Sequence, residues 1–360
     1  MSLRYLEVSS VRNLTSLSIT PSPTLNILYG ANGSGKSSVL EAIHILGLGR
    51  SFRTLQARKL VQDGYIRATV FGKVDRNGLP IGVGIQKSQD GETVIKVDGC
   101  VVSSAANLAE LLPLQVLTPD SHELLQGEPK ERRAFLDWGL FHVEHNYLEL
   151  WRRYRRVLQQ RNAGLRGRLS QEEIGHWDAA LADCGEKIAV LRAHYLSSLS
   201  GYFLPLYARL VGSEETVELA YRRGWTKELP LAAVLKRNYD SEIATGYTMA
   251  GPHRADFRVL VAGADAVDRL SRGQQKLAVC ALRLAQARHL AETQGRVCTF
   301  LVDDLPAELD PEKRELLLSA LVELGGQCFV TATERQLVEP TSSIDCKVFH
   351  VERGAVAEVI

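Results

Sequence analysis

The spacing of apolar residues changes along this chain, and each change predicts a different kind of secondary structure. Near the N-terminus apolar and polar residues alternate, which is typical of strands with one buried face. The predicted strands are Leu3–Val11, Leu14–Thr20 and Leu25–Tyr29. Since Pro21 and Pro23 break the pattern before the third strand, we expect a short β-meander over residues 3–29.

A helical pattern follows at residues 39–46, and strand-like segments return between residues 65 and 102. The turns between these strands carry Asn77-Gly78, Asp90-Gly91 and Asp98-Gly99, which favour tight hairpins. The predicted strands are Ile66–Phe71, Ile81–Gln86, Thr93–Val97 and, past a change of character near residue 113, Leu114–Leu117.

Apolar residues recur at helical spacing from Pro129 to about Tyr207. Two long helices, Arg132–Gly164 and Glu172–Tyr207, are separated by a short break, so we expect an antiparallel pair. A mixed region follows, with a strand at Val217–Tyr221, a helix at Leu231–Thr245 and a strand at Phe257–Val261.

Helices and strands alternate again towards the C-terminus. The predicted elements are a helix at Gly273–Glu292, a strand at Cys298–Val302, a helix at Glu312–Leu324, a strand at Cys328–Thr331 and a hairpin formed by Val348–Glu352 and Val356–Val359. The chain is therefore predicted to be an α/β protein. Residues 1–112 and 266–360 form one discontinuous domain, and residues 113–265 form a mostly helical insertion.

Composition narrows the class of protein only slightly. The chain has 360 residues, a net charge of +1, and 45% hydrophobic and 24% charged residues, as in an ordinary globular protein. Its six cysteines form no C-x-x-C pair, which fits a reducing cytosol and argues against a zinc knuckle or a disulfide framework. The N-terminus lacks the apolar core of a signal peptide, and no apolar run is long enough to span a bilayer. We therefore expect a cytoplasmic protein without a membrane partner.

The strongest chemical signal is the G-x-x-x-x-G-K-S pattern that follows the third predicted strand. It consists of Gly30, Ala31, Asn32, Gly33, Ser34, Gly35, Lys36 and Ser37. Glycines let successive N–H groups turn towards phosphate oxygens, and the N-terminus of the following helix adds partial positive charge. Lys36 is expected to reach the β- and γ-phosphates of ATP, and the Ser37 hydroxyl is expected to bind Mg²⁺.

A second signal is the apolar segment Thr299–Val302, which ends in Asp303 and Asp304. Ligands of open α/β sheets lie at such strand ends. Asp303 is expected to hold Mg²⁺, and Asp304 is expected to orient or deprotonate an attacking water. The alternative is a solvated pair of carboxylates without a catalytic role.

The segment Leu270-Ser271-Arg272-Gly273-Gln274 resembles the L-S-G-G-Q signature motif of ABC-type ATPases and lies 32 residues before Asp303. Ser271, Gly273 and Gln274 begin a predicted helix, whose N-terminus suits a γ-phosphate. In that family the phosphate belongs to the opposite subunit. The alternative is a serine that only caps the helix.

Other segments also resemble parts of ABC-type ATPases. Ala307-Glu308-Leu309-Asp310 looks like the D-loop, which lies along a dimer seam, and Pro306 stiffens the turn before it. Thr331-Ala332-Thr333 stands where many of these enzymes carry a γ-phosphate-sensing histidine, so fast hydrolysis is not expected. The glutamine that senses Mg²⁺ in this class corresponds either to Gln115 or to the position of Thr118.

These motifs, their order and the size of the insertion resemble the RecF family of bacterial recombination-repair ATPases over essentially the whole chain. The segments that carry the resemblance are Val11–Leu14, Gly30–Ser37, Gly49–Thr54, Pro129–Asp137, Gly251–Arg254 and Leu270–Gln274. The resemblance implies a P-loop ABC-type ATPase head, with a mixed-sheet lobe I and a helical lobe II that lacks a long coiled coil.

The same resemblance implies an ATP-dependent homodimer in which each phosphate loop faces the other chain's signature. It also implies binding to DNA, preferably at junctions of single- and double-stranded DNA. RecR would be the partner, acting with RecO to help place RecA on gapped DNA and to support the SOS response. Slow DNA-stimulated ATP hydrolysis and an ATP-binding switch with negligible turnover both remain open. A transporter's ATP-driving subunit is disfavoured by the long insertion and by Asp304 in place of the usual glutamate.

One segment of the sequence also indicates DNA contact, because Trp151–Arg168 contains seven arginines and no acid. Arg152, Arg153, Arg155 and Arg156 are the expected phosphate contacts, and Arg50 and Arg53 are further candidates. The alternative is a solvated helix whose arginines pair with nearby acids such as Glu172 and Glu173. The lone His253 is expected to be a structural hydrogen-bonding residue.

Overall fold

The computed structural model describes residues 2–54, 56–76, 78–213, 215–304, 308–338 and 345–359. The chain divides into two compact units: Met1–Ser121 with Ala287–Ile360, called unit 1, and His122–Gln286, called unit 2. The predicted boundaries lay at residues 113 and 266. The boundaries of the two units differ from these predicted positions. Leu114–Leu117 pairs with a strand of unit 1, and the residues just after 266 are helical and belong to unit 2.

Unit 1 contains two sheets, and the first is antiparallel with the order β2-β1-β4-β5-β6-β7. Its strands are β1 (Ser2–Val11), β2 (Leu14–Ile19), β4 (Arg67–Arg76), β5 (Leu79–Ser88), β6 (Thr93–Val97) and β7 (Cys100–Val101). Buried and exposed residues alternate along β4, as expected for a sheet with one face in water.

The second sheet of unit 1 has the order β15-β14-β3-β13-β12-β8 and is parallel except for β15. Its strands are β3 (Leu25–Tyr29), β8 (Leu114–Leu117), β12 (Thr299–Val302), β13 (Cys328–Ala332), β14 (Cys346–Glu352) and β15 (Ala355–Val359). Strands from both ends of the sequence therefore build one sheet, as the pattern of elements predicted.

The predicted meander over residues 3–29 is wrong in one respect. Strands β1 and β2 form a hairpin, but β3 leaves them and pairs with β13 and β14. The reason is visible in the burial, because β2 alternates whereas Leu25–Leu28 are all buried. A continuous apolar run of this kind suits the middle of a parallel sheet that is covered on both faces.

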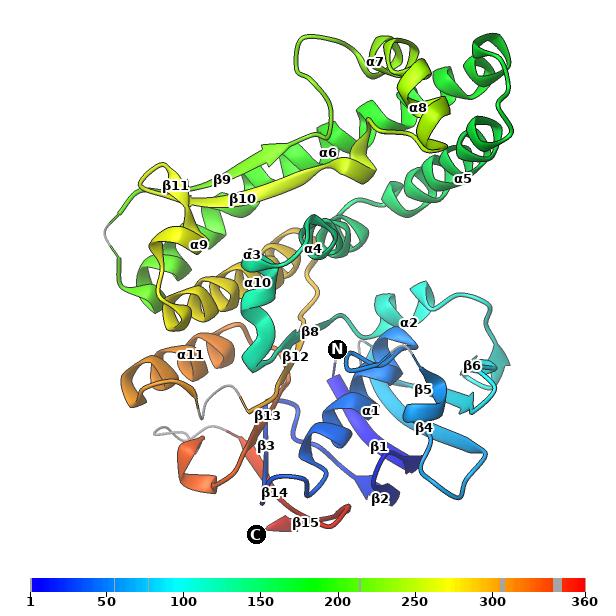
Figure 1. Cartoon of the computed structure of the whole chain (residues 1–360). Coiled ribbons are helices and arrows are strands. Elements are labelled where there is room, and N and C mark those ends of the chain that lie inside the picture. The colour runs from blue at the N-terminus through cyan, green and yellow to red at the C-terminus, as the bar shows by residue number, and fades with distance from the viewer. Residues whose placement is uncertain are drawn as a thin grey trace. The chain divides into compact units, whose positions relative to one another are not determined.

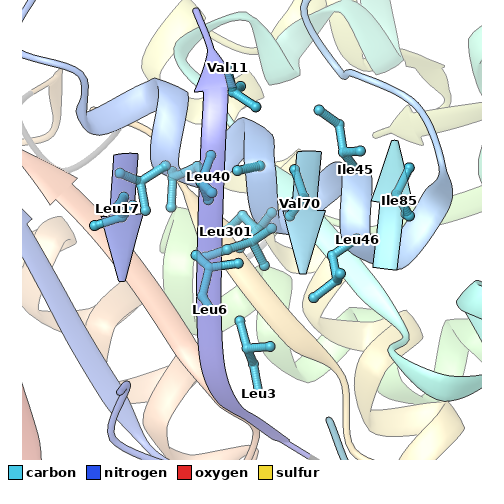
Figure 2. Close-up of a cluster of buried hydrophobic side chains, with 14 of the residues drawn as sticks. Leu3, Leu6, Val11, Leu17, Leu40, Ile45, Leu46, Val70, Ile85 and Leu301 are labelled. Atoms are coloured by element: carbon cyan, nitrogen blue, oxygen red, sulfur yellow. The ribbon is translucent and has the colours of Figure 1, made fainter. Parts of the chain in front are cut away.

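Helix α1 (Lys36–Leu48) supplies much of the core of unit 1, because almost all of its residues are buried. Figure 2 shows Leu40, Ile45 and Leu46 of α1 among Leu6, Val70 and other side chains of the antiparallel sheet, with Leu301 of the parallel sheet nearby. Burial of this kind stabilises a fold by about 25 cal/mol per Å² of apolar surface. The remaining helices of unit 1 are η1 (Ala57–Lys59), α2 (Ala106–Leu111), η2 (Pro119–His122, its last residue in unit 2), α11 (Pro311–Glu323) and η5 (Arg335–Leu337).

Unit 2 is built on the antiparallel pair α5 (Tyr147–Arg166) and α6 (Gln171–Val211), which was predicted. In Figure 1 the long α6 runs alongside a small antiparallel sheet of β9 (Val217–Arg222), β10 (Asp256–Val261) and β11 (Ala264–Asp265). The other helices are α3 (Glu123–Gln126), α4 (Pro129–Val143), α7 (Leu231–Arg237), α8 (Tyr239–Thr245), η3 (Pro252–Arg254), α9 (Ala266–Arg269) and α10 (Arg272–Gln294), whose C-terminal part lies in unit 1.

Two predicted helices of unit 2 are each divided in the structure. The helix predicted over Arg132–Gly164 is α4 followed by α5, because Glu144 adopts an extended conformation and ends α4. The chain then turns so that the buried Tyr147 donates a hydrogen bond to Asp137 on α4. The helix predicted over Leu231–Thr245 is α7 followed by α8, with Asn238 between them.

Both long helices are too short for an extended coiled-coil arm. At 1.5 Å per residue, the 41 residues of α6 span about 60 Å and the 20 residues of α5 about 30 Å. A capping box between Ser170 and Glu173 starts α6 immediately after the turn that follows α5. No helix in the described part of the chain is long and apolar enough to cross a membrane.

Candidate nucleotide-binding site

The predicted phosphate loop connects β3 to α1 in a conformation that requires glycine. Gly30, Gly33 and Gly35 have φ values of 154°, 77° and 120°, which side chains of L-residues rarely adopt. A Cβ atom on Gly30 would also lie 2.2 Å from the carbonyl oxygen of Val351. Lys36 Nζ donates hydrogen bonds to the carbonyl oxygens of Gly30 at 2.8 Å and Ala31 at 3.2 Å, so the lysine folds back along its own loop.

Hydrogen bonds from two turns elsewhere in unit 1, which were not predicted from the sequence, stabilise the phosphate loop. The N–H of Gly354, in the turn between β14 and β15, donates to Ser34 O at 2.7 Å. Asn13, in the turn between β1 and β2, accepts a hydrogen bond from Ser38 Oγ at 2.8 Å and donates to Gly33 O at 3.3 Å. The only available signal was Asn13 in the family-like segment Val11–Leu14.

The two predicted carboxylates lie beside the loop at the end of β12. Ser37 Oγ donates a hydrogen bond to Asp303 Oδ1 at 2.9 Å, although 266 residues separate them in the sequence. Asp304 lies just beyond the strand, with a φ of 47°, and lines the cavity beside the loop. The structure therefore brings together Lys36, Ser37, Asp303 and Asp304.

Thr331 on the neighbouring strand β13 links the two carboxylates. Its Oγ1 lies 2.9 Å from Asp303 Oδ1 and 3.3 Å from Asp304 Oδ1, and it accepts a hydrogen bond from Asp304 N at 2.8 Å. In the sequence, this position was noted only because many ABC-type ATPases carry a γ-phosphate-sensing histidine there. The fully buried threonine instead fixes the end of β12 relative to β13.

The chemistry of these oxygens fits Mg²⁺. Burial raises the pKa of the Asp303 carboxyl, while hydrogen bonds from Ser37 and Thr331 oppose the rise by favouring the carboxylate. A hydroxyl and a carboxylate oxygen are hard ligands, and Mg²⁺ bound to a nucleotide needs few protein ligands beyond them. Among the described residues, no cluster of three or more His, Cys, Asp or Glu is suited to a metal.

A cavity of about 980 Å³ opens beside the loop, which is ample for a nucleoside triphosphate. Cations outnumber acids along its wall, so it favours a polyanion. Its lining consists of Arg12, Asn13, Asn32, Gly33, Gly35, Lys36, Ser37, Ser38, Arg53, Gln56, Arg58, Lys59, Val61, Gln62, Asp63 and Asp304. Arg53, which the sequence suggested as a DNA contact, belongs to this wall.

Glu41 forms ion pairs with two arginines of the cavity wall, Arg12 and Arg53, although it does not itself line the cavity. Its side chain is fully buried on α1 and accepts a bidentate pair from Arg12, with both N–O distances at 2.9 Å. Arg53 NH1 lies 3.7 Å from Glu41 Oε2, and the hydroxyl of Ser51 donates to Glu41 Oε1. Arg12 NH1 also donates to Lys59 O at 2.6 Å, so its guanidinium has a fixed orientation.

Glu41→Gln should therefore weaken ATP binding although Glu41 does not line the cavity. Loss of the charge frees Arg12 and Arg53, and hydrogen bonds to charged groups contribute about 1.5–3 kcal/mol. We expect ATP affinity to fall by about tenfold or more in calorimetric titration. Glu92→Gln, an exposed glutamate of the same unit, should leave affinity unchanged. Equal affinities for Glu41→Gln and the unaltered chain would contradict this anchoring role.

The signature-like residues lie in unit 2, at the start of α10. Ser271 Oγ accepts a hydrogen bond from Gln274 N at 3.3 Å, and Gln274 Oε1 accepts one from Ser271 N at 2.9 Å. Ser271 and Gly273 are exposed. The serine is thus a helix cap, as the alternative held, but its hydroxyl proton remains able to donate to a ligand.

Other predicted residues have local roles in the structure. Asp310 caps α11 by accepting from Lys313 N at 2.9 Å. Gln115 is buried within β8, and neither it nor Thr118 lines the cavity. Ala307 of the D-loop-like segment and Pro306 just before it lie outside the described residues, as does Asn77. His253 makes structural hydrogen bonds in unit 2, to Tyr154 and to Thr248.

The arginine-rich stretch lies on α5 except for Arg168, which follows the end of the helix, and the arginines differ in burial. Arg152, Arg153, Arg155 and Arg156 are exposed, whereas Arg161 is fully buried and bonded to Asp178 and Glu242. Within the described residues, Arg153, Arg155 and Arg156 form no ion pair. Glu173, suggested as a partner, instead bonds to Ser170 at the start of α6.

Comparison with known proteins covers the whole chain. The family described as RecF/RecN/SMC N terminal domain matches residues 2–357. A DNA replication and repair protein RecF of Pseudomonas aeruginosa is 46% identical over 362 residues, which cover 99% of this chain and 98% of the relative. The RecF of a Pseudomonas putida strain is 45% identical over the same share of both chains.

Solved structures agree with these sequence relationships. A structure of the recombination mediator protein RecF with ATP, from the RecFOR pathway, matches with a TM-score of 0.87 and 27% identity. The match covers 100% of this chain and 98% of that one. An SMC head bound to the winged-helix domain of ScpA matches with a TM-score of 0.62 at 15% identity, over 100% of this chain and 97% of that one, and shares the fold.

Proposed function

This chain belongs to the RecF family of DNA replication and repair proteins, and from that premise we propose that it is an ATP-dependent DNA-binding protein of recombinational gap repair. One observation carries the proposal: Lys36, Ser37, Asp303 and Asp304 converge on a cationic cavity that fits a triphosphate. The solved relative described as RecF with ATP supports ATP as the ligand.

Each residue of the loop has a defined role in this proposal. The backbone of Gly30–Gly35 and the Lys36 ammonium bind the phosphates, and the charge of the ammonium offsets that of the triphosphate. Ser37 and Asp303 would hold Mg²⁺, which would neutralise charge on the phosphates. Asp304 orients the attacking water or accepts its proton from the edge of the cavity.

We propose that ATP joins two copies of the chain. Ser271, Gly273, Gln274 and Asp310 of one copy would contact the ATP held by the loop of the other, so a single copy has an incomplete site. Ser271 and Gly273 are exposed at the N-terminus of α10, where an anion is favoured by free N–H groups and the helix dipole. Hydrolysis, which we expect to be slow and stimulated by DNA, would release the pair.

DNA contact is proposed for the exposed face of α5. Arg153, Arg155 and Arg156, with Arg152 beside them, can neutralise phosphates and release counterions. The expected ligands are single-stranded DNA and junctions with duplex DNA. The protein partner is RecR acting with RecO, as the RecFOR pathway of the solved relative suggests, in RecA loading and SOS induction.

Mixing two inactive variants tests the shared site. Lys36→Ala removes the loop's cation, and Ser271→Arg blocks the helix terminus, so neither variant alone should dimerise with ATP or retain gapped DNA. A mixed dimer has one site with both defects and one with neither. We therefore expect the mixture to recover ATP-dependent dimers in sedimentation and part of the DNA retention. A mixture that behaves as the sum of its components would exclude a site shared between copies.

A further inference from the structure

The segment from Tyr247 to Arg254, called the 247–254 loop, presents unusual side chains for a surface loop of unit 2. Tyr247 and Met249 are each 41% exposed, and Arg254 is exposed. The guanidinium of Arg254 lies over the Tyr247 ring, 5.2 Å from its centroid. An arginine and an aromatic ring in this arrangement attract each other and together present a flat, cationic surface.

Buried polar groups hold the beginning of this loop rigidly. Thr248 donates from its N–H and its hydroxyl to Asn162 Oδ1, at 2.8 and 2.7 Å. Met249 N donates to Glu242 Oε1 at 2.7 Å, and the opposite oxygen of Glu242 accepts from Arg161 at 2.6 Å. Thr248, Glu242 and Arg161 are almost completely inaccessible to water. Their hydrogen bonds therefore fix the backbone between the exposed side chains of Tyr247 and Met249.

The end of the loop is held in the same way. Arg192, which is fully buried, donates to Pro252 O at 2.7 Å. His253 Nε2 donates to Thr248 O at 3.0 Å, and its Nδ1 accepts from the Tyr154 hydroxyl at 2.6 Å. Burial, with the positive charges of Arg254, Arg133 and Arg192, lowers the pKa of His253 to about 4, so the ring is neutral at pH 7 and keeps both bonds.

Positive charge surrounds the loop on both sides. The stem of the exposed Arg166 lies against Gly246, where an added Cβ would be 3.0 Å from it. Arg133 NH1 donates to Ala255 O at 3.0 Å, next to Arg254. The arginines on both sides of the Tyr247 ring favour a polyanion with flat rings over an apolar protein segment.

We propose that Tyr247 and Arg254 form a stacking platform for an unpaired base of single-stranded DNA. The inference rests on the proposed DNA binding and names one surface for it. Tyr247 stacks on the base, and Arg254 and Arg166 contact the adjacent phosphates. Bases of duplex DNA are already stacked and paired, so the platform distinguishes single strands from duplexes. A braced loop loses little conformational entropy on binding, because its backbone is already ordered.

Binding of the full chain with ATP to three probes tests this proposal. The probes are an oligothymidylate of about 15 nucleotides, an abasic strand of equal length, and a duplex. Tyr247→Ala should weaken binding to the oligothymidylate about 5- to 150-fold, the range expected for loss of one stacked base. Binding to the abasic strand and the duplex should change less than about twofold. Tyr247→Phe, which keeps the ring, should retain the affinity of the unaltered chain.

Controls separate this proposal from the function on which it rests. Tyr65→Ala removes a similarly exposed tyrosine of unit 1 and should have no effect on any probe. If the unaltered chain binds DNA with ATP but Tyr247→Ala weakens all probes equally or none, the platform is excluded and the proposed function stands. If Tyr247→Ala only abolishes binding to RecR, the loop is a protein-binding surface and the proposal fails. If the unaltered chain binds no probe, the proposed function fails as well.

Discussion

Lys36→Ala should abolish useful ATP binding, with the largest functional effect of any single substitution. The ammonium is buried in the loop and lies 2.8 Å from Gly30 O, on the wall of the cavity that fits the triphosphate. Removing one partner of a buried, hydrogen-bonded charge pair costs about 2–5 kcal/mol. We therefore expect ATP affinity to fall about 30- to 4,000-fold in calorimetric titration.

A conservative variant separates charge from geometry at this position. Lys36→Arg keeps the positive charge, but a planar guanidinium cannot replace the compact ammonium between Gly30 O and Ala31 O. An intermediate loss of affinity is expected. If Lys36→Ala binds ATP within about threefold of the unaltered chain, the loop does not bind the triphosphate as proposed.

Arg161→Met should cause the largest loss of stability outside the apolar core. Arg161 donates to Glu242 Oε2 at 2.6 Å and Asp178 Oδ1 at 2.7 Å, and both Arg161 and Glu242 are fully buried. Breaking a buried pair by removing one partner costs about 3–5 kcal/mol, because the other charge is left without compensation. We expect the free energy of unfolding of unit 2 to fall by about that amount in urea denaturation.

The chain itself offers the probe and the control for this measurement. All four tryptophans, residues 138, 151, 177 and 225, lie in unit 2, so their fluorescence reports its unfolding. Arg155→Met, on the exposed face of the same helix, should change stability by less than about 0.5 kcal/mol. Adding Glu242→Gln to Arg161→Met should recover part of the loss. Equal stabilities for Arg161→Met and Arg155→Met would show that the buried pair is not needed.

Local patterns predicted much of the fold and part of the candidate site. Strands β3, β6 and β8 were predicted with the bounds that the structure gives them, and the loop Gly30–Ser37 lies between a strand and a helix as expected. Glycine, proline and the spacing of apolar residues act on a few neighbouring residues, so the sequence displays them directly. The convergence of this loop with Asp303 was also expected, because ligands of open α/β sheets lie at the ends of strands such as Thr299–Val302.

Burial of charged and polar side chains was not predictable in this way. Arg161 belongs to the same arginine-rich stretch as Arg155 and Arg156, which were expected to contact phosphates, yet it is buried while they are exposed. Glu41 was not singled out in the sequence, and Thr331 was noted only because it stands where many ABC-type ATPases carry a histidine. The environment of each is set by segments that are distant in the sequence.

The sequence by itself determined the family, the alternation of elements and the glycine-rich loop for which we propose nucleotide binding, because these depend on residue types at short fixed spacings. Only the tertiary structure decided that β3 joins the parallel sheet, that Glu41 fixes Arg12 and Arg53, and that a buried network braces the 247–254 loop. These depend on pairings such as Ser37 with Asp303, across 266 residues, which are selected by packing and hydrogen bonding of the whole unit.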